Sequence, residues 1–231
     1  MIPYMEVLLV TARQELRGLV VKTLAITPSG ALSPGPLSAS AVAIGALLGP
    51  LGGFLVALGH MLFELPYVML LVKWAERFNR VLARVEKPLN LVVAGFIVFF
   101  AYGLFRDAAA ALSGTVNTGS AITVGGGVLG ALLTGAVLTG FNPYFLAWWV
   151  TVGLPLVRGA AEHGVKGFTV MYASHVWMDY AWLVLLAAAG AGLSRIAGLY
   201  AALLAGLGVV LLLFAADMLA RSFAGKRILP F

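Results

Sequence analysis

The sequence contains no cysteine and few charged residues. Without cysteine the chain forms no disulfide, offers no thiolate to a metal ion and carries no dithiol for redox chemistry. Charged residues make up only 10% of the 231 positions and hydrophobic residues 61%, whereas about a quarter of the residues are charged in a soluble globular domain. This composition excludes an ordinary soluble domain and predicts a chain embedded in lipid.

Two long stretches of the sequence contain almost no charged residues. Residues 108–157 contain no Asp, Glu, Lys or Arg, and residues 23–72 contain only Glu64. A helix needs about 20 apolar residues to cross the hydrocarbon core of a bilayer. The pattern therefore predicts an all-α integral membrane protein with six transmembrane helices, at about 18–48, 51–72, 88–105, 126–156, 167–192 and 196–219.

The first and fourth predicted spans are too long for one straight crossing, and both contain residues that break helices. The breaks are Ser33–Pro34–Gly35–Pro36 in the first span and Asn142–Pro143 in the fourth. Proline removes a backbone donor and clashes with the preceding turn, so we expect both spans to be broken or strongly kinked. Helix ends inside the protein offer a positive N-terminus to a substrate carboxylate.

The basic residues predict the orientation of the chain. Six spans put both termini and the loops 73–87 and 157–166 on one side, which receives 13 of the 15 Lys and Arg residues. By the positive-inside rule we predict a multi-pass protein of the cell membrane with cytoplasmic N- and C-termini. The basic residues sit beside hydrophobic spans, so we assign the net charge of +6 to membrane lipid headgroups and expect no nucleic-acid partner.

Residues 1–17 show a different pattern from the spans. Their apolar side chains recur at helical spacing, opposite Glu6, Arg13 and Arg17. The apolar positions are Met5, Leu8, Leu9, Ala12 and Leu16. The pattern predicts a short amphipathic helix lying on the membrane surface.

The chain repeats itself weakly. Each half begins with a broken span and continues with a span that carries a histidine and, four residues later, an acid: His60 and Glu64, then His175 and Asp179. Three spans per half is an odd number, so the second half enters the membrane from the opposite side. We predict one transmembrane domain of two inverted 3+3 repeats, at about 18–107 and 125–220, as in many secondary transporters with a substrate site near the midplane.

The two pairs carry the candidate chemistry. An ionisable side chain deep in a bilayer costs free energy unless it meets a partner or a water-filled cavity. We identify His60, Glu64, His175 and Asp179 as the ionisable side chains deep in the predicted spans. If they face each other, two imidazoles and two carboxylates can exchange protons near neutral pH. They can also bind a divalent metal such as zinc, manganese or iron. We favour protons, because the loops contain no metal-capturing segment; a neutral structural pairing is the third interpretation.

Aromatic residues near the breaks are candidates for a substrate path, with packing or an interfacial belt as the alternative. They are Tyr144, Trp148, Trp149 and Trp177.

The segment SPGPLSASAVAIGALLGPLGGFLVALGH, the following Glu64 and the segment TGFNPYFLAWW together resemble the lysine exporter (LysE) family of amino-acid efflux proteins, over about residues 18–219. The resemblance implies a six-helix secondary exporter, driven by the proton gradient, that removes amino acids or related small metabolites from the cytoplasm. The residues that match the motifs of the family are Pro34–Gly35–Pro36, Glu64 and Asn142–Pro143. His60 and His175 are not expected of typical members.

The sequence is thus compatible with three functions. We expect a transporter with a small-molecule substrate and protons as partners, and not an enzyme. A divalent metal-ion exporter that uses His60, Glu64, His175 and Asp179 is the alternative, and an intramembrane enzyme or a scaffold is the third. No resident cofactor is expected, and a homo-oligomer is left open.

Overall fold

The computed structural model describes residues 2–114 and 123–228, apart from the side chains of residues 2–12, 75, 76, 78, 79, 82 and 83. Every regular element in these residues is a helix, which confirms the all-α prediction. The helices are α1 (Ile2–Ile26), α2 (Pro28–Ala31), α3 (Pro36–Leu48), α4 (Pro50–Leu112), α5 (Gly127–Gly140), α6 (Pro143–Val150), α7 (Leu154–Glu162), α8 (Gly164–Leu193) and α9 (Ala197–Leu219), which a π-helical turn (Ala220–Ala224) follows.

The described residues contain four helical segments that are long and apolar enough to cross a membrane, and two bent pairs. The four are Pro50–Trp74, Arg84–Leu112, Gly164–Leu193 and Ala197–Ala224. The bent pairs are Arg13–Ala31 with Pro36–Leu48, at 73°, and Gly127–Gly140 with Pro143–Val150, at 57°. Counting each pair as one span gives six spans with the first and fourth broken, in agreement with the sequence prediction.

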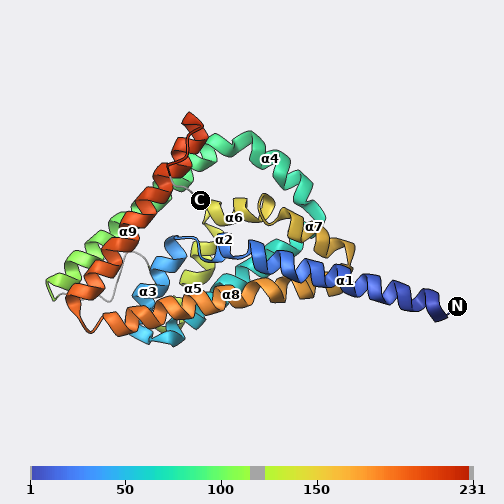
Figure 1. The fold of residues 1–231 in the computed structure, drawn as a ribbon. Coiled ribbons are helices and arrows are strands. Elements are labelled where there is room, and N and C mark those ends of the chain that lie inside the picture. The colour runs from blue at the N-terminus through green and yellow to red at the C-terminus, as the bar shows by residue number, and fades with distance from the viewer. Residues whose placement is uncertain (1, 115–122, 229–231) are drawn as a thin grey trace.

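Two elements differ from the predicted boundaries. α4 is one helix of 63 residues that joins the second and third predicted spans without interruption, so the segment 73–87 between them is helical. It contains Pro66 and Pro88, and it bends so that its two halves form separate spans (Figure 1). Residues 2–17 belong to α1, which continues without a break to Ile26. Their location on a membrane surface stays a prediction, and most of their side chains lie outside the described residues.

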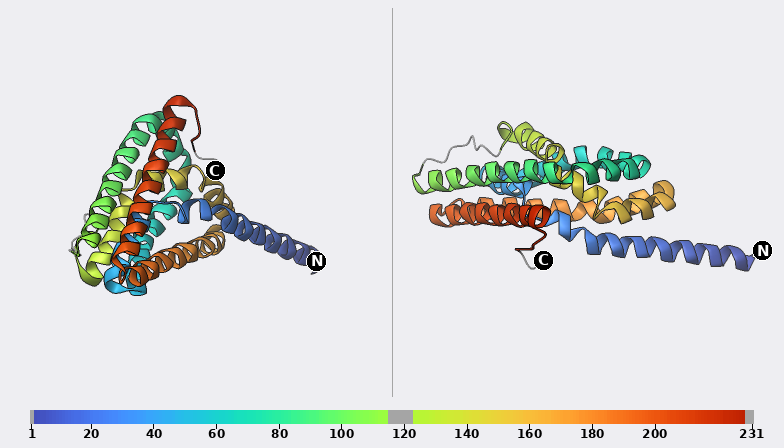
Figure 2. Two further views of the ribbon diagram at one scale, coloured as in Figure 1. Left: turned by 60° about the vertical axis from the view of Figure 1, so that its left-hand side comes forward. Right: turned by 90° about the horizontal axis from the view of Figure 1, so that it is seen from above.

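The helices are arranged as a V (Figure 1). One arm consists of α9 and the second half of α4, and the other contains α1, α7 and α8. The arms meet where α8 leads into α9, and α4 bridges the gap between their far ends. In the view from above, α9, α8 and α1 lie in one layer and α4 in another (Figure 2). In Figure 1, α2 and α6, which belong to the two bent pairs, lie between the arms.

Close helix contacts tie the two halves of the chain together. α5 packs on the first half of α4, and α3 packs on α8. At the first contact a Cβ on Gly135 would overlap the carbonyl oxygen of Val56, and at the second a Cβ on Gly190 would overlap that of Val42. Small residues allow this approach of backbones, as they do in membrane proteins generally.

Candidate functional site

The four ionisable side chains that the sequence pairs come together in the structure. His60 and Glu64 lie on one face of α4, and His175 and Asp179 on one face of α8, because a spacing of four returns to the same side of a helix. All four are buried, and Glu64 is only 1% exposed. Burial of this kind requires partners for every charge.

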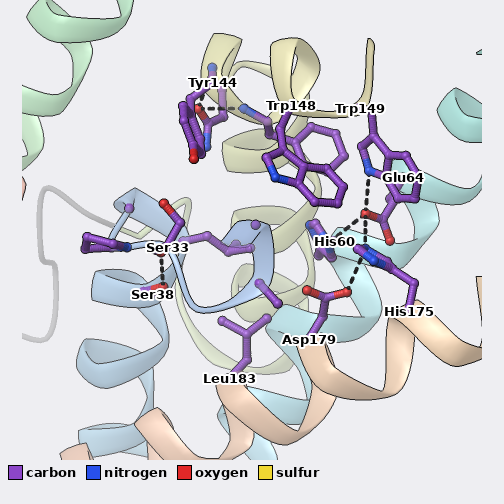
Figure 3. Close-up of a pocket in the computed structure, with 17 residues that line it drawn as sticks. Ser33, Ser38, His60, Glu64, Tyr144, Trp148, Trp149, His175, Asp179 and Leu183 are labelled. Carbon is purple, nitrogen blue, oxygen red and sulfur yellow. Dashed lines mark hydrogen bonds and ion pairs between the residues drawn. The ribbon is translucent and has the colours of Figure 1, made fainter. Parts of the chain in front are cut away.

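The four side chains form a continuous row (Figure 3). His60 Nε2 lies 3.4 Å from Glu64 Oε1. His175 Nε2 lies 3.3 Å from the same oxygen and 3.3 Å from Asp179 Oδ2. The order along the row is therefore His60, Glu64, His175 and Asp179, with each carboxylate in contact with an imidazole.

A threonine hydroxyl fixes the proton on His60. Thr139 Oγ1 donates its hydrogen to the carbonyl of Gly135 at 2.6 Å, so this oxygen can only accept from His60 Nδ1, 2.8 Å away. A neutral His60 then carries its hydrogen on Nδ1 and a lone pair on Nε2. Because that lone pair faces Glu64 Oε1, the contact needs one additional proton or a cation between the two atoms.

His175 has an equivalent hydroxyl partner from the other broken helix. Its Nδ1 lies 2.9 Å from Thr27 Oγ1. Its ring also packs against Trp149, with ring centroids 4.7 Å apart. The histidine of each half is thus oriented by a threonine of the other half's broken span: Thr139 orients His60, and Thr27 orients His175.

Glu64 is surrounded by donors. Trp149 Nε1 donates to Oε1 at 3.0 Å, and the hydroxyl of Tyr172 donates to Oε2 at 3.1 Å. The indole N–H can only donate, and the phenol of Tyr172 uses its one hydrogen on Glu64. This arrangement stabilises Glu64 as a carboxylate.

Asp179 has fewer partners. Its Oδ2 is buried and has no hydrogen bond within the described parts of the chain, although His175 Nε2 is 3.3 Å away. His175 Nε2 lies equally close to Glu64 Oε1, so a hydrogen on that nitrogen is shared between the two carboxylates. Asp179 is therefore the carboxylate of the row that is best able to gain a proton or a cation.

A cavity of about 80 Å³ adjoins the row. All four ionisable side chains border it, with residues from both helix breaks and from α6. The predicted residues that line it are Ser33, Pro34, Gly35, Asn142, Tyr144, Trp148 and Trp149. A water molecule needs about 10–15 Å³ of cavity volume, so this cavity has room for several water molecules.

The two helix breaks differ in their capping. Pro36 and Pro143 occupy the first turns of α3 and α6, where the missing N–H is harmless. Asn142 caps α6, since its side-chain oxygen accepts from the backbone N–H groups of Tyr144 and Phe145 at 3.1 and 3.4 Å. Among the described residues no side chain caps α3. The positive end of α3 at the cavity is thus available to a polar ligand.

One predicted path residue lies elsewhere. Trp177 is 52% exposed and does not border the cavity. It follows His175 by two positions, which on a helix is nearly the opposite side. The structure therefore places Trp177 on the outer surface of α8, while Trp148 and Trp149 pack against His175.

Four residues of the site region were not identified from the sequence. Thr27, Thr139 and Tyr172 supply the hydroxyl groups described above, and Asp217 on α9 is a further buried carboxylate, 1% exposed, paired with Arg221. Tyr172 lies three positions before His175, and Asp217 four before Arg221, so helical spacing was an available signal. The two threonines share only their position shortly before a break.

The row also has donors for a metal ion. One ligand atom each from His60, Glu64 and Asp179 lie within 4.8 Å of one another, and all three residues are buried. Ligating histidines usually donate their other N–H to a fixed acceptor, as His60 does to Thr139. The donor set thus suits a divalent cation as well as protons.

Broken spans that enclose buried ionisable groups and a cavity are features of multi-pass membrane transporters. The family model of the LysE type translocator matches residues 28–222, so the chain belongs to the LysE type translocator family. The resemblance seen in the sequence is confirmed, and the protein is a translocator for small solutes and not an enzyme. The comparisons with curated proteins and with solved structures gave no match.

Proposed function

We propose that this translocator exports amino acids or related small metabolites from the cytoplasm in exchange for protons. The observation that carries the proposal is the buried row of His60, Glu64, His175 and Asp179 beside a cavity. A row that alternates imidazole and carboxylate passes protons between neighbours over short distances. The tautomer of His60 makes one of those contacts dependent on an extra proton.

The two carboxylates take different roles in this proposal. Glu64 acts as a fixed negative charge, because Trp149 and Tyr172 both donate to it. Asp179 takes up and releases the proton, because its Oδ2 has no hydrogen bond within the described residues and its side chain belongs to the wall of the cavity. His175 connects the two.

Two inverted halves are part of the same proposal. The crossed contacts support it: a threonine from each broken span orients the histidine of the other half, and α3 packs on α8 as α5 packs on α4. Residues 18–107 and 125–220 are the proposed repeats. Transporters of this architecture rock one half against the other around a central site.

The orientation rests on charge. Thirteen of the 15 Lys and Arg residues lie in the segments on the side of the termini, which we assign to the cytoplasm. The open end of the V, where α4 bridges the arms, then faces the cytoplasm (Figure 1). A solute from the cytoplasm enters the molecule from that end.

Inverted membrane vesicles with an imposed pH gradient test the proposal. Solute uptake should depend on the gradient in wild type and lose that dependence when Glu64→Gln is combined with Asp179→Asn. Unchanged gradient-driven uptake by the double variant would remove the proton role of the row.

A divalent metal ion is the second candidate substrate, because the donors of His60, Glu64 and Asp179 lie close together. Imidazole and carboxylate together suit zinc, manganese and iron. Metal analysis of the purified protein, repeated on His60→Ala and His175→Ala, separates the two functions. Metal bound by wild type and lost in His60→Ala supports this candidate; the same low content in all three proteins contradicts it.

A further inference from the structure

A second, larger cavity lies next to the one that adjoins the row. Its volume is about 630 Å³, and it is bordered by the second half of α4, by the end of α9 and by the first helix break. Small-molecule sites in proteins usually measure about 300–1,000 Å³. The outer cavity has the size of a solute site, whereas the inner cavity of about 80 Å³ has room for several water molecules only.

The outer cavity has charged and polar walls. Glu86, Asp217 and Arg221 border it, which gives two carboxylates and one guanidinium, a formal charge of −1. Asp217 is paired with Arg221 and also accepts from the backbone N–H of Ile228 at 2.7 Å. The remaining charge is that of Glu86, which is exposed at the start of this half of α4.

Amide and hydroxyl groups complete this wall. Asn90 Nδ2 donates to Ser222 Oγ at 3.2 Å, and this bond joins α4 to the π-helical turn that follows α9. Both side chains border the cavity. They add hydrogen-bonding groups beside Glu86, in a position where a solute's polar atoms can reach them.

Three residues belong to the walls of both cavities: Ser33, Pro34 and Tyr144. Two of them are in the first helix break, and the third is on α6, where its ring meets that of Phe214 with centroids 5.1 Å apart. A solute in the outer cavity therefore contacts the wall that separates it from the inner cavity. Figure 3 shows Ser33 and Tyr144 on the side of the inner cavity away from Asp179 and His175.

We propose that the transported solute binds in the outer cavity, as an ammonium-bearing molecule with its cationic group toward Glu86, while the row of His60, Glu64, His175 and Asp179 exchanges protons in the separate inner cavity. This inference rests on the proposed export function and adds the place of the solute. Ser33, Pro34 and Tyr144 couple the two sites, since their movement changes both cavities.

Binding of three probes to the purified full chain in detergent tests this division. L-arginine, L-glutamine and L-glutamate share a backbone and carry a net positive, no net and a net negative charge. L-arginine should bind most tightly, because its side chain adds a second cationic group to the ammonium that all three probes share. Glu86→Gln should weaken L-arginine binding by about three- to fivefold, which is the effect of one charge at an exposed site. Glu162→Gln removes an exposed acid of α7 outside the cavity and should leave binding unchanged.

A second variant tests the volume of the site. Ser222→Phe puts a ring into the outer cavity and should weaken all three probes by at least about tenfold. Glu64→Gln combined with Asp179→Asn should still bind L-arginine, because it leaves the outer cavity intact. Binding that is lost in this double variant but kept in Glu86→Gln and Ser222→Phe would overturn the inference and place the solute in the inner cavity.

The remaining outcomes separate this inference from the proposed function. If wild type binds none of the probes, an ammonium-bearing solute in the outer cavity is contradicted. If binding follows the expected pattern but L-arginine transport in proteoliposomes is not accompanied by proton movement, the proposed proton exchange is contradicted. The assignment of the solute to the outer cavity is then still supported.

Discussion

His60 on α4 and Thr139 on α5 are joined by a hydrogen bond of 2.8 Å whose direction is determined by a third group. Thr139 donates to the carbonyl of Gly135 at 2.6 Å, so His60 must donate to Thr139. In a neutral His60 the other ring nitrogen then faces Glu64 at 3.4 Å without a hydrogen of its own. A hydroxyl outside the ionisable row thus determines where a proton is needed within it.

The first prediction concerns this hydroxyl. Thr139→Val removes the acceptor, so a neutral His60 is free to carry its hydrogen on Nε2 and donate it to Glu64. The contact then needs no additional proton, and we expect solute transport in proteoliposomes to depend less on the pH gradient. Thr139→Ser keeps the hydroxyl and should behave as wild type. Equal pH dependence in the valine and serine variants would contradict this role.

The second prediction separates the two carboxylates. Glu64→Gln turns its amide N–H₂ either toward Trp149, whose indole cannot accept, or toward Tyr172, whose hydroxyl hydrogen then loses its acceptor. An unsatisfied buried donor costs about 1–3 kcal/mol. Asp179→Asn loses no hydrogen bond at Oδ2 among the described residues. We expect a larger drop in thermal stability for Glu64→Gln than for Asp179→Asn, while Asp179→Asn alone abolishes proton-driven transport. Size-exclusion thermostability and vesicle uptake measure the two effects; the reverse order of stability would contradict the assignment.

The third prediction tests the close contact of α4 and α5. Gly135→Ala places a Cβ against the carbonyl of Val56, and overpacking of this kind costs about 1–3 kcal/mol. Gly206→Ala on α9 is the matched control, since a Cβ there meets nothing within 4 Å. We expect a clear loss of thermal stability for Gly135→Ala and none for Gly206→Ala. Similar melting temperatures for the two variants would argue against the packing described.

The fourth prediction concerns His163, outside the spans. Its Nδ1 lies 3.0 Å from the carbonyl of Gly159 and its Nε2 lies 3.1 Å from Glu15 Oε2 on α1. Both ring nitrogens donate only when the ring is cationic, so the Gly159 carbonyl first, and Glu15 next, raise the pKa of His163 above 6.5. The contact stabilises the fold fully below pH 6.5, and this contribution is lost as pH rises through the raised pKa.

Melting temperatures of wild type and His163→Gln across pH measure this contribution. The difference between the two proteins should be present at acidic pH and disappear in alkaline buffer. It should also shrink in high salt, because the site is exposed. Glu15→Gln should weaken the same pH dependence. A difference that grows with rising pH would contradict the assignment.

Much of the fold follows from local sequence. Charge-free stretches predict the spans, since charged side chains are costly in lipid wherever the helices pack. Pro34, Pro36 and Pro143 predict the breaks, because proline acts on the turn that contains it. The long helix α4 differs, because nothing in the sequence required the segment between its two spans to leave the helical conformation.

The pairing of His60 with Glu64 and of His175 with Asp179 also needed only helical spacing. Which other groups they meet did not follow from that spacing. Thr139 and Trp149 are far from His60 and Glu64 in the chain, and they reach them only because α5 and α6 pack against α4. Helix crossings of this kind depend on the shape of whole surfaces, such as the contact at Gly135.

The sequence by itself determined that this protein lies in a membrane, where its helices break and that His60, Glu64, His175 and Asp179 are buried, because hydropathy, proline geometry and helical spacing act over a few neighbouring residues. Only the tertiary structure decided the direction of the bond from His60 to Thr139, the exclusion of Trp177 from the inner cavity and the presence of the outer cavity beside it. These features arise where helices from distant parts of the chain meet, and packing between them sets distances that no local pattern contains.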